Sequence, residues 1–432
     1  MKDILKEFKA FFENYKIPLK SKFLIGVSGG VDSMSVLNLA IEAKLNIEVA
    51  HINYQLRGEE SKKENKIVKD FCNKYSIILH SKYCKINYSE NIQNEARKIR
   101  YEFFNTILIG NKLNYIITAH HKNDSHETFF LNAIRGSGLK GLKGIPEIRG
   151  NIIRPILGFT KSDLLKYVEL KNIPFNHDSS NFENKYNRNF IRNEIIKKLY
   201  NRFPSFEKGL TKSIENIKKD YTLLRQLVDK TVLPFIEKKE DNLTIYYNNN
   251  IPELCWFYFL RDFGFNFDQV SLWIKKNHQP GKQIINDKFR LIKDRDCWII
   301  SPVKESLNRQ VFKINENQNI NFPIKLRISK EMTNSPIQKN HNIGLFDLNK
   351  ITFPLTIRKW KNGDYMTPLG LRGKKKISDI LVDKKISIVE KENIYVLISN
   401  HEIIWLIGYC VSEKYKVKQR NKKNLKITFL GK

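Results

Sequence analysis

The hexapeptide Ser28–Ser33 (SGGVDS) has residue types and a spacing that suit phosphate binding. Gly29 and Gly30 lack side chains, so their backbone N–H groups can come close to phosphate oxygens. The two serines add hydroxyl groups, and the helix expected to follow points its positive end at the same place. A serine and glycine turn that only caps a helix is the alternative. The position of SGGVDS between an apolar run and an expected helix favours a nucleotide-binding loop over this alternative.

Asp32 is the acidic residue of this loop, and it points to a metal ion. A carboxylate repels phosphate unless a cation such as Mg²⁺ lies between the two. The loop lacks the lysine that the P-loop of γ-phosphate hydrolases requires, so that type of loop is excluded. We therefore expect a nucleotide with Mg²⁺, and Asp32 is the candidate metal ligand.

The elements that would position this loop alternate between strands and helices over the first two hundred residues. The expected strands are residues 23–27, 47–54, 77–83 and 115–119, and the expected helices are residues 32–43, 59–75 and 92–108. Strands separated by single helices form parallel βαβ units. Ligands bind beyond the carboxyl ends of such strands. SGGVDS, HINYQLRGEES (51–61) and HHKNDSHET (120–128) each follow an expected strand and should share one edge of the sheet.

The pattern changes after residue 204, which predicts several domains. We expect a parallel, doubly wound α/β sheet over residues 1–204, followed by a mainly helical middle domain over 205–305. A long helix near 205–230 and a hairpin at 282–300 belong to this middle domain. Residues 306–345 are rich in Asn, Gln and Lys and are expected to form a linker with some extended segments. Residues 346–432 are expected to form a small α+β domain.

The composition is strongly basic, with 76 Lys+Arg against 45 Asp+Glu and a formal net charge of +31. A surplus of this size suits a polyanionic partner such as RNA, although a biased overall composition is the alternative. No segment reaches the roughly 18 apolar residues of a membrane-spanning helix, so no membrane partner is expected. The five cysteines form no CxxC pair, which excludes a zinc ribbon or disulfide scaffold and favours a reducing cytoplasm.

SGGVDS resembles the SGGxDS hallmark of the PP-loop ATP pyrophosphatase superfamily. Further segments resemble the lysidine synthetases within it, with Tyr54 where that family often has His. They occur in family order: HINYQLRGEES, EARKIRY (95–101), HHKNDSHET, RGSGLKGLKG (135–144), RPIL (154–157) and DSSNFENKYNRNFIR (178–192). RKWKNGDYMTPLG, KKISDILVDKKI and IIWLIGY resemble the C-terminal domain of the same family.

This resemblance implies an adenine nucleotide α-hydrolase-like fold and an enzyme that uses ATP and Mg²⁺. In the family, adenylate is transferred to the wobble cytidine of the isoleucine tRNA with a CAU anticodon, and pyrophosphate is released. The ε-amine of free L-lysine then attacks the activated carbon, and AMP leaves. The resemblance assigns these residues to the ATP phosphates and metal: Ser28, Gly29, Gly30, Val31, Asp32 and Ser33.

Asp124 and Glu127 are the acidic residues of HHKNDSHET, and their spacing places both on one face of a helix. By resemblance they hold the lysine ammonium or the metal, although acids in a first helical turn also simply complement the helix dipole. Asn123 and Ser125 depart from the family pattern. Asn123 carries no charge, so we place the essential carboxylate at Asp124.

The remaining candidates are one histidine and four arginines. His121 follows an expected strand, which favours a role in the site over a role in the core. Arg97 and Arg100 are candidates for ATP or tRNA contact. Arg188 and Arg192 suit phosphate or AMP because guanidinium is bidentate and always charged. We expect Asp32, Asp124 and Arg188 to be catalytic, and His121, Glu127, Arg97, Arg100 and Arg192 to bind substrate.

Two other functions remain open. A related tRNA thiolase would need a persulfide-carrying cysteine, for which Cys72 and Cys84 are poorly placed. A basic RNA-binding protein with a relic nucleotide site is the non-enzymatic alternative, and the intact SGGVDS disfavours it. In the C-terminal domain, Arg372, Lys374–Lys376 and Lys414–Lys423 either contact phosphates or form a solvated basic face. A homodimer is left open.

Overall fold

The computed structural model describes residues 3–55, 59–84, 92–176, 187–276, 279–303, 310–316, 318–332, 340–417 and 423–431. The chain forms two compact units, Met1–Arg225 and Gln226–Lys432. Among these described residues, no helix has the length and apolar character needed to cross a membrane.

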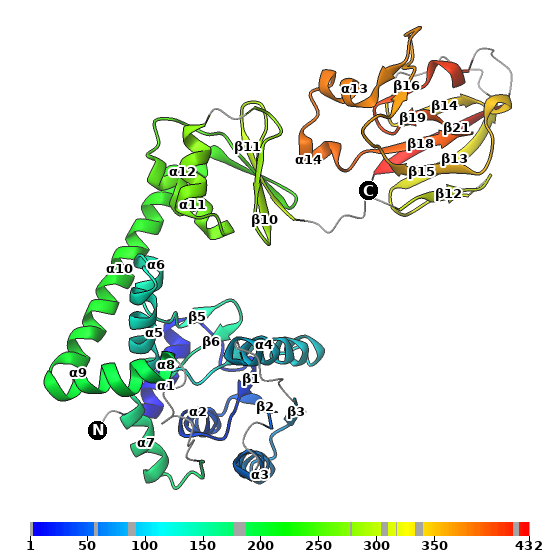
Figure 1. The fold of residues 1–432 in the computed structure, drawn as a ribbon. Helices are drawn as coiled ribbons and strands as arrows, with labels where there is room; N and C mark the ends of the chain where they lie inside the picture. The colour runs from blue at the N-terminus through cyan, green and yellow to red at the C-terminus, as the bar shows by residue number, and fades with distance from the viewer. Residues whose placement is uncertain are drawn as a thin grey trace. The chain divides into compact units, whose positions relative to one another are not determined.

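The first unit is built on a six-stranded sheet with the strand order β3-β2-β1-β4-β6-β5 (Figure 1). Its strands are β1 (Lys22–Gly26), β2 (Asn46–Asn53), β3 (Leu79–Tyr83), β4 (Tyr115–Ile117), β5 (Ile148–Arg149) and β6 (Ile152–Ile153). All neighbours pair in parallel except β5 and β6, which are antiparallel. The expected parallel α/β fold is confirmed, and each of the four expected strands is present.

Helices cover both faces of this sheet, because successive side chains of β1 point to opposite sides. Phe23 and Ile25 pack into one core with α1, α2, α3 and α7, whereas Leu24 packs into a second core beneath α4. The helices of this unit are α1 (Ile4–Asn14), α2 (Val31–Glu42), α3 (Glu59–Lys74), α4 (Ile92–Gly110), α5 (Lys122–Ile134), α6 (Leu139–Leu142), α7 (Lys161–Leu170), α8 (Asn187–Phe190), a π-helical turn (Ile191–Ile196) and α9 (Lys197–Arg202).

The long helix α10 (Phe206–Val232) contains the boundary between the two units and agrees with the long helix expected near 205–230. Beyond it, the helices α11 (Glu253–Leu260) and α12 (Phe267–Lys275) accompany a five-stranded antiparallel sheet. Its strands are β7 (Ile236–Lys239), β8 (Asn242–Ile245), β9 (Gln283–Ile285), β10 (Phe289–Lys293) and β11 (Trp298–Pro302). The predicted hairpin over 282–300 corresponds to β9, β10 and β11.

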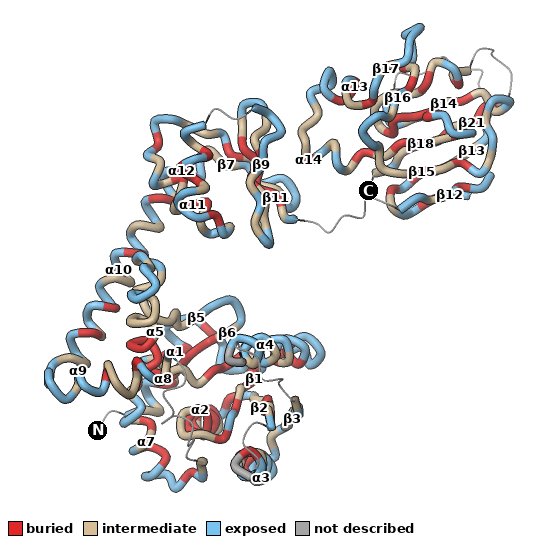
Figure 2. The backbone as a smooth tube through the Cα atoms, in the orientation of Figure 1, coloured by how far each residue is buried: buried red, intermediate tan, exposed pale blue. Residues whose placement is uncertain are grey.

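The C-terminal part holds a five-stranded sheet and a three-stranded sheet, with the orders β12-β15-β18-β19-β20 and β13-β21-β14. Strands of both sheets carry buried residues, which are red in Figure 2. The strands are β12 (Phe312–Ile314), β13 (Lys325–Met332), β14 (Ile343–Asp347), β15 (Leu355–Lys359), β18 (Tyr395–Ser399), β19 (Glu402–Leu406), β20 (Cys410–Val411) and β21 (Lys423–Gly431). A hairpin of β16 (Tyr365–Met366) and β17 (Lys375–Lys376) and the helices α13 (Ile377–Asp383) and α14 (Ile388–Lys391) complete it.

β12 and β13 lie within residues 306–345, which the sequence suggested to be a linker with some extended segments, and β14 begins there. β12 pairs with β15, and β13 and β14 pair with the two sides of β21. The sequence did not indicate this pairing, because the partner strands lie far along the chain. The described strands of this segment are thus built into the C-terminal sheets.

Gly26 at the end of β1 is a packing constraint that can be tested. A methyl group on Gly26 would come within 2.5 Å of Cζ of Phe104, a buried residue of α4. We expect Gly26→Ala to destabilise the protein by roughly 1–3 kcal/mol, because overpacking forces neighbouring side chains to move. The free energy of unfolding in urea measures this effect.

Gly110→Ala is the matched control, because a Cβ at Gly110 meets nothing within 4 Å. Gly110→Ala should change the free energy of unfolding by no more than about 0.5 kcal/mol. A slight stabilisation is also compatible, because alanine lowers the conformational entropy of the unfolded chain. Replacing Phe104 by Leu should recover part of the stability lost in Gly26→Ala. Equal losses for the two glycine variants would contradict the proposed clash.

Candidate active site

The loop between β1 and α2 is closed by its own serine hydroxyls. Oγ of Ser33 accepts a hydrogen bond from the backbone N–H of Ser28 (3.2 Å) and donates one to the carbonyl oxygen of Gly30 (3.0 Å). Ser33 is buried in the first turn of α2, which begins at Val31. The loop therefore keeps its shape without a ligand.

Gly29 has a backbone conformation that requires glycine. Its φ of 92° is in the left-handed region, where residues with a Cβ are strained. A Cβ would also lie 3.4 Å from the backbone of Glu64 on α3. The carbonyl oxygen of Gly29 accepts a hydrogen bond of 2.9 Å from the N–H of Asn176, which holds the loop against a distant segment.

A cavity of about 420 Å³ lies over this loop and the adjoining carboxyl ends of β1, β2 and β4. That volume is within the usual range for small-molecule sites. Predicted residues in its wall are Ser28, Gly30, Asp32, Ser33, Arg100, Asp124 and Arg188. Predicted residues outside its wall are Gly29, Val31, Arg97, His121, Glu127 and Arg192. Residues 56–58 and 177–186 of the matched motifs lie outside the described part of the chain.

Asp124 and Glu127 on α5 are tied to two arginines from α8 and the π-helical turn. Arg188 binds both carboxylates, with Nη2 2.8 Å from Oδ1 of Asp124 and Nε 2.6 Å from Oε2 of Glu127. Nε of Arg192 lies 2.5 Å from Oε1 of Glu127. The side chain of Glu127 is only 1% exposed, so it lies beneath the arginines, and Asp124 is the carboxylate at the cavity wall.

The charges in this cluster stabilise one another. Burial alone would raise the pKa of Asp124, but the neighbouring charges of His121 and Arg188 lower it. Burial alone would lower the pKa of Arg192, but its hydrogen bond and charge interaction with Glu127 raise it. A buried carboxylate without a partner would cost several kcal/mol, which the paired arrangement avoids.

His121 links this cluster to the phosphate loop. Its Nε2 lies 3.6 Å from a carboxylate oxygen of Asp32 and 3.6 Å from Oδ2 of Asp124. Burial alone would lower the pKa of His121, but the neighbouring carboxylates of Asp32 and Asp124 raise it. His121 is 2% exposed and lies between these two carboxylates.

His120 is a cavity residue that the sequence reasoning did not single out. Its ring lines the cavity, and Nδ1 lies 3.0 Å from Oγ1 of Thr118. Burial lowers the pKa of His120 to about 4, and the charges of Arg154 and Arg188 act in the same direction, although Asp124 opposes them. A neutral imidazole therefore faces the cavity at pH 7. The two consecutive histidines after β4 could have indicated this role for His120 in the sequence, because either ring could point into the cavity.

Arg100 and Arg97 occupy different environments, although both lie on α4. Arg100 lines the cavity, and its Nε donates to the hydroxyl of Tyr54 (3.4 Å), which in turn donates to the carbonyl oxygen of Ala96 (3.0 Å). The guanidinium of Arg97 lies over the ring of Tyr101 at 4.9 Å, outside the cavity wall. Arg100 is thus the better placed of the two for ligand contact.

The residues that depart from the family pattern at α5 have structural partners. The side-chain oxygen of Asn123 accepts from the backbone N–H of Lys161 (2.9 Å), and its amide nitrogen donates to the hydroxyl of Tyr200 (3.2 Å). Oγ of Ser125 accepts from the N–H of Ile145 (3.4 Å). Asn123 therefore fixes α5 against α7 and α9.

Asp32 is the residue best suited to hold a metal ion. Its Oδ1 is buried and has no hydrogen-bond partner among the described residues. The described residues contain no cluster of three or more His, Cys, Asp and Glu that could form a complete metal site. Mg²⁺ needs few protein ligands when phosphate oxygens and water complete its shell. The residues present therefore fit an Mg²⁺ ion carried by a nucleotide and held by Asp32.

Comparison with known proteins adds independent findings. Residues 1–199 match the family model of the PP-loop domain. Residues 246–303 match the TilS substrate binding domain, and residues 355–427 match the TilS substrate C-terminal domain.

Named relatives match nearly the whole chain. The tRNA(Ile)-lysidine synthase of Parabacteroides distasonis is 30% identical over 440 residues, which cover 98% of this chain and 99% of that protein. The enzyme of the same name from Bacteroides thetaiotaomicron is 32% identical over 93% of this chain and 94% of its own length.

Solved structures match parts of the chain. The U34-tRNA thiolase NcsA from Methanococcus maripaludis is 18% identical with a TM-score of 0.42, over 50% of this chain and 78% of its own. A crystal structure of a TILS C-terminal domain is 16% identical with a TM-score of 0.26, over 28% of this chain and 98% of its own.

His126 on α5 gives a pH-dependent prediction. Its Nδ1 and Nε2 each lie 3.0 Å from a hydroxyl, of Tyr200 and Thr211 respectively. Burial lowers its pKa to about 4, and the charge of Lys122 adds to this. The unfolded chain binds this proton near pH 6.5, whereas the folded protein does not. The free energy of unfolding should therefore fall as the pH drops from about 6.5 to 4.

His126→Gln keeps polar atoms at this position but does not titrate, so the fall in unfolding free energy should be shallower. It should not vanish, because burial lowers the pKa of His120 in the same way. Urea unfolding at several pH values measures the slope. His401→Gln at an exposed turn is the control, and its unfolding free energy should depend on pH as steeply as that of the parent protein. An unchanged slope in His126→Gln would contradict the prediction.

Proposed function

The chain belongs to the tRNA(Ile)-lysidine synthase family, and we propose that it joins free L-lysine to the wobble cytidine of the CAU-anticodon isoleucine tRNA at the expense of ATP. The observation that carries this proposal is the common cavity wall of the phosphate loop, Asp124, Arg188 and Arg100. One cavity thus offers groups for a triphosphate, for an amine and for RNA.

In the first step, the exocyclic carbonyl oxygen of the cytosine attacks the α-phosphorus of ATP and forms an O–P bond. The bond between the α-phosphorus and the β-phosphate breaks, and pyrophosphate leaves. The backbone N–H groups at Gly29 and Gly30 and the positive end of α2 favour the phosphates. Asp32 would hold the Mg²⁺ ion that neutralises phosphate charge as pyrophosphate departs. Arg100, which lines the same cavity, would add positive charge to this step.

In the second step, the lysine ε-amine attacks the activated ring carbon, and the carbon–oxygen bond breaks to release AMP. Asp124 is proposed to receive the ammonium group, in competition with Arg188 for Oδ1. Arg188 would then be free to bind the departing AMP. The amine must lose its proton to solvent before it attacks, because the ring of His120, with a pKa of about 4, accepts a proton poorly at pH 7.

This proposal revises the expected role of Glu127. Both of its carboxylate oxygens bind arginines, and the side chain is 1% exposed. We propose that Glu127 positions Arg188 and Arg192, and that Asp124 alone meets the lysine.

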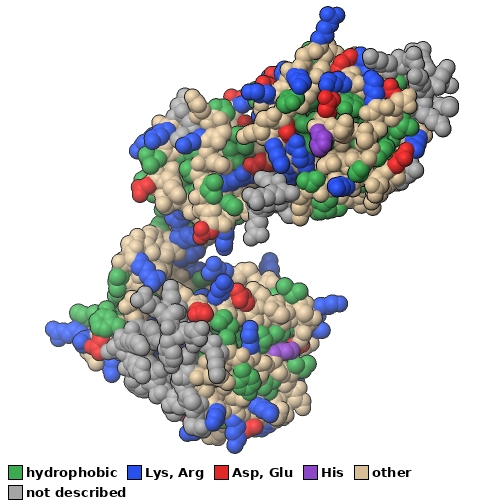
Figure 3. Space-filling model, turned by 45° about the vertical axis from the view of Figure 1, so that its right-hand side comes forward, with side chains coloured by type: hydrophobic (Ala, Val, Ile, Leu, Met, Phe, Trp, Pro, Cys, Tyr) green, Lys and Arg blue, Asp and Glu red, His purple; other side chains and the backbone are tan. Residues whose placement is uncertain are grey.

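The RNA partner is consistent with the charge of the chain. Lys and Arg side chains are spread over the visible face of each unit (Figure 3), and the formal net charge is +31. Each phosphate that a Lys or Arg neutralises releases counterions, so affinity for tRNA should fall steeply with salt. A cytoplasmic location would supply tRNA, ATP and lysine, and a homodimer is compatible with the proposal but not required by it.

A tRNA thiolase is the second candidate within the superfamily. It would need a reactive cysteine beside the phosphate loop, and the cavity wall contains none among the described residues. Burial raises the pKa of Cys72 to about 11, which suppresses the thiolate that such chemistry uses.

The function is tested by incubating the purified protein with ATP, Mg²⁺, radiolabelled lysine and transcripts of the CAU-anticodon isoleucine and methionine tRNAs. We expect acid-stable label in the isoleucine transcript alone, with matching release of AMP and pyrophosphate. Pyrophosphate without lysine incorporation would support adenylation and require another nucleophile. Labelled sulfur in the tRNA would establish a thiolase instead.

Asp32→Ala should abolish pyrophosphate release while the affinity for tRNA stays within about twofold. The reason is that Asp32 acts on the nucleotide and its metal, whereas tRNA affinity comes mainly from basic residues. Filter binding of labelled tRNA and a pyrophosphate assay measure the two effects. Asp70→Ala on the exposed side of α3 is the control. Near-normal turnover in Asp32→Ala would overturn the role of Asp32.

Asp124→Asn should slow lysine transfer more than adenylation, by about 10²-fold or more, because it removes the proposed charge partner of the amine. Adenylated tRNA should accumulate in single-turnover experiments with radiolabelled ATP. Asp220→Asn on the exposed side of α10 serves as the control. If adenylation alone is slowed, Asp124 acts on the nucleotide and its proposed role is wrong.

A further inference from the structure

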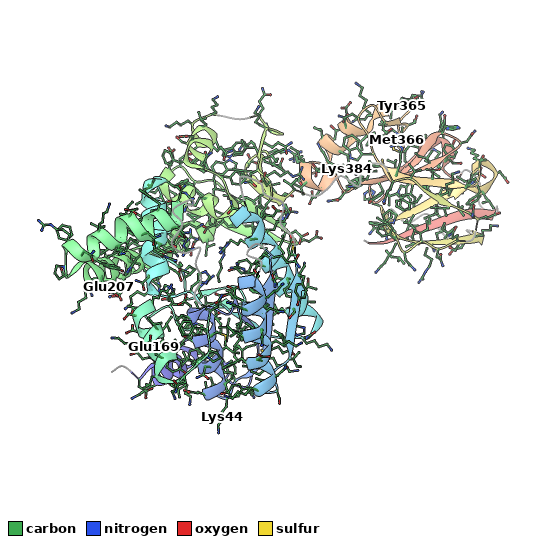
Figure 4. The ribbon with its side chains drawn as sticks, turned by 60° about the horizontal axis from the view of Figure 1, so that its bottom comes forward. Lys44, Glu169, Glu207, Tyr365, Met366 and Lys384 are labelled. Atoms are coloured by element: carbon green, nitrogen blue, oxygen red, sulfur yellow. The ribbon has the colours of Figure 1, made fainter. Side chains whose placement is uncertain are left out.

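The hairpin β16–β17 and the adjoining helix α13 expose an unusual amount of apolar surface. Tyr365, Leu369 and Leu371 of the hairpin are 53%, 52% and 46% exposed, and Val382 on α13 is 54% exposed. Single exposed apolar residues are normal, but several on adjoining elements mark an interaction surface. Tyr365 and Lys384 can be found on this part of the chain in Figure 4.

A cavity of about 500 Å³ opens beside this hairpin, within the C-terminal sheets. Its walls are mainly apolar, and their aliphatic residues come from the hairpin loop, α13, β14, β20 and the segment that follows β20: Ile343, Leu345, Pro368, Leu369, Leu371, Ile380, Val411 and Val417. The aromatic side chains of Trp405 and Tyr409 also belong to its lining. The volume of this cavity is within the usual range for small-molecule sites and is large enough for a nucleobase.

The same cavity is bordered by lysines, which a purely apolar ligand would not need. Lys375, Lys384 and Lys416 are among its lining residues. Lys375 pairs with Asp383, and Lys416 pairs with Glu413. Lys384 follows α13 directly and makes no ion pair with any described residue. Its ammonium group is thus available to an anion at the cavity.

A further lysine combines with an aromatic ring on the same hairpin. Nζ of Lys374 lies 4.5 Å from the centre of the ring of Tyr365. Exposed aromatic rings next to cationic groups are typical of surfaces that bind unpaired nucleotides, because the base stacks while the phosphate is neutralised. Lipid headgroups would also find cations here, but a cation beside an exposed aromatic ring favours a nucleotide, whose base can stack on the ring.

We propose that this pocket, formed by the β16–β17 hairpin, α13, β14 and β20, binds an unpaired nucleotide of the RNA substrate. The base enters the cavity, and Lys384 contacts the adjoining phosphate. This inference rests on the proposed function, in which tRNA is the substrate. It gives the C-terminal unit a specific task beyond general electrostatic attraction.

The test uses the full-length protein and a fluorescein-labelled single-stranded hexaribonucleotide, r(CACACA), with a 12-base-pair RNA duplex for comparison. Leu371→Ser and Lys384→Gln should each weaken binding of the single strand by about tenfold, the effect expected for one stacked base. Leu371→Ser should leave duplex binding unchanged, because a paired base cannot enter the cavity. Fluorescence anisotropy measures both affinities.

Two matched variants control for general effects. Leu430→Ser changes an equally exposed leucine on β21, and Lys361→Gln removes an exposed lysine outside the pocket lining. Both should bind the single strand as the parent protein does. In lysine transfer, Leu371→Ser should raise the KM for tRNA and leave kcat within about twofold.

Three outcomes would overturn the proposal. Unchanged single-strand binding in Leu371→Ser would show that the cavity takes no base. Equal losses for single strand and duplex in both pocket variants would indicate a plain basic surface. Binding of phosphatidylglycerol vesicles that depends on Leu371, with no effect on RNA, would make a lipid the occupant.

The failure of the proposed function would look different. If the protein incorporates no lysine but binds r(CACACA) through Leu371 and Lys384, the pocket proposal stands and the proposed function is wrong. If lysine transfer is normal but neither substitution changes single-strand binding, the proposed function stands and the pocket proposal is wrong.

Discussion

The structure of the site depends on the need to neutralise buried carboxylates. Glu127 is almost fully buried, and Asp124 lies beside it at the edge of the cavity. Neither can remain charged there without cationic partners, because an unpaired buried charge costs several kcal/mol. Arg188 and Arg192 supply these partners from a segment more than 60 residues further along the chain. The ion pairs therefore attach that segment to α5 and bring Arg188 into the cavity wall.

Alternating charges continue this arrangement toward the phosphate loop. His121 lies between Asp124 and Asp32, and these two carboxylates raise its pKa against the effect of burial. Basic and acidic groups therefore alternate along the site, in the order Arg188, Asp124, His121 and Asp32. This order keeps groups of opposite character close together before substrate binds. Such an arrangement suits a reaction in which a triphosphate and an ammonium group must share one cavity, since each finds a partner of opposite sign.

The C-terminal unit is held together by pairings that are distant in sequence. β21, near the end of the described chain, lies between β13 and β14, which precede it by more than 70 residues. This closure places the β16–β17 hairpin, α13 and β14 around one cavity. Its aliphatic walls and lysine border differ from the polar cavity of the first unit, so the two units are suited to different parts of a ligand.

The sequence alone determined the phosphate loop, the four strands of the α/β sheet and the choice of Asp124 and Arg188. These follow from local patterns: glycines that permit a positive φ, apolar runs that must be buried, and motifs in fixed order. Only the tertiary structure decided that Glu127 lies beneath two arginines, that His120 faces the cavity, and that residues 312–347 contribute strands to the C-terminal sheets. Each of these depends on partners far apart in the chain. Burial and hydrogen bonding are set by such partners, and no local pattern of residues records them.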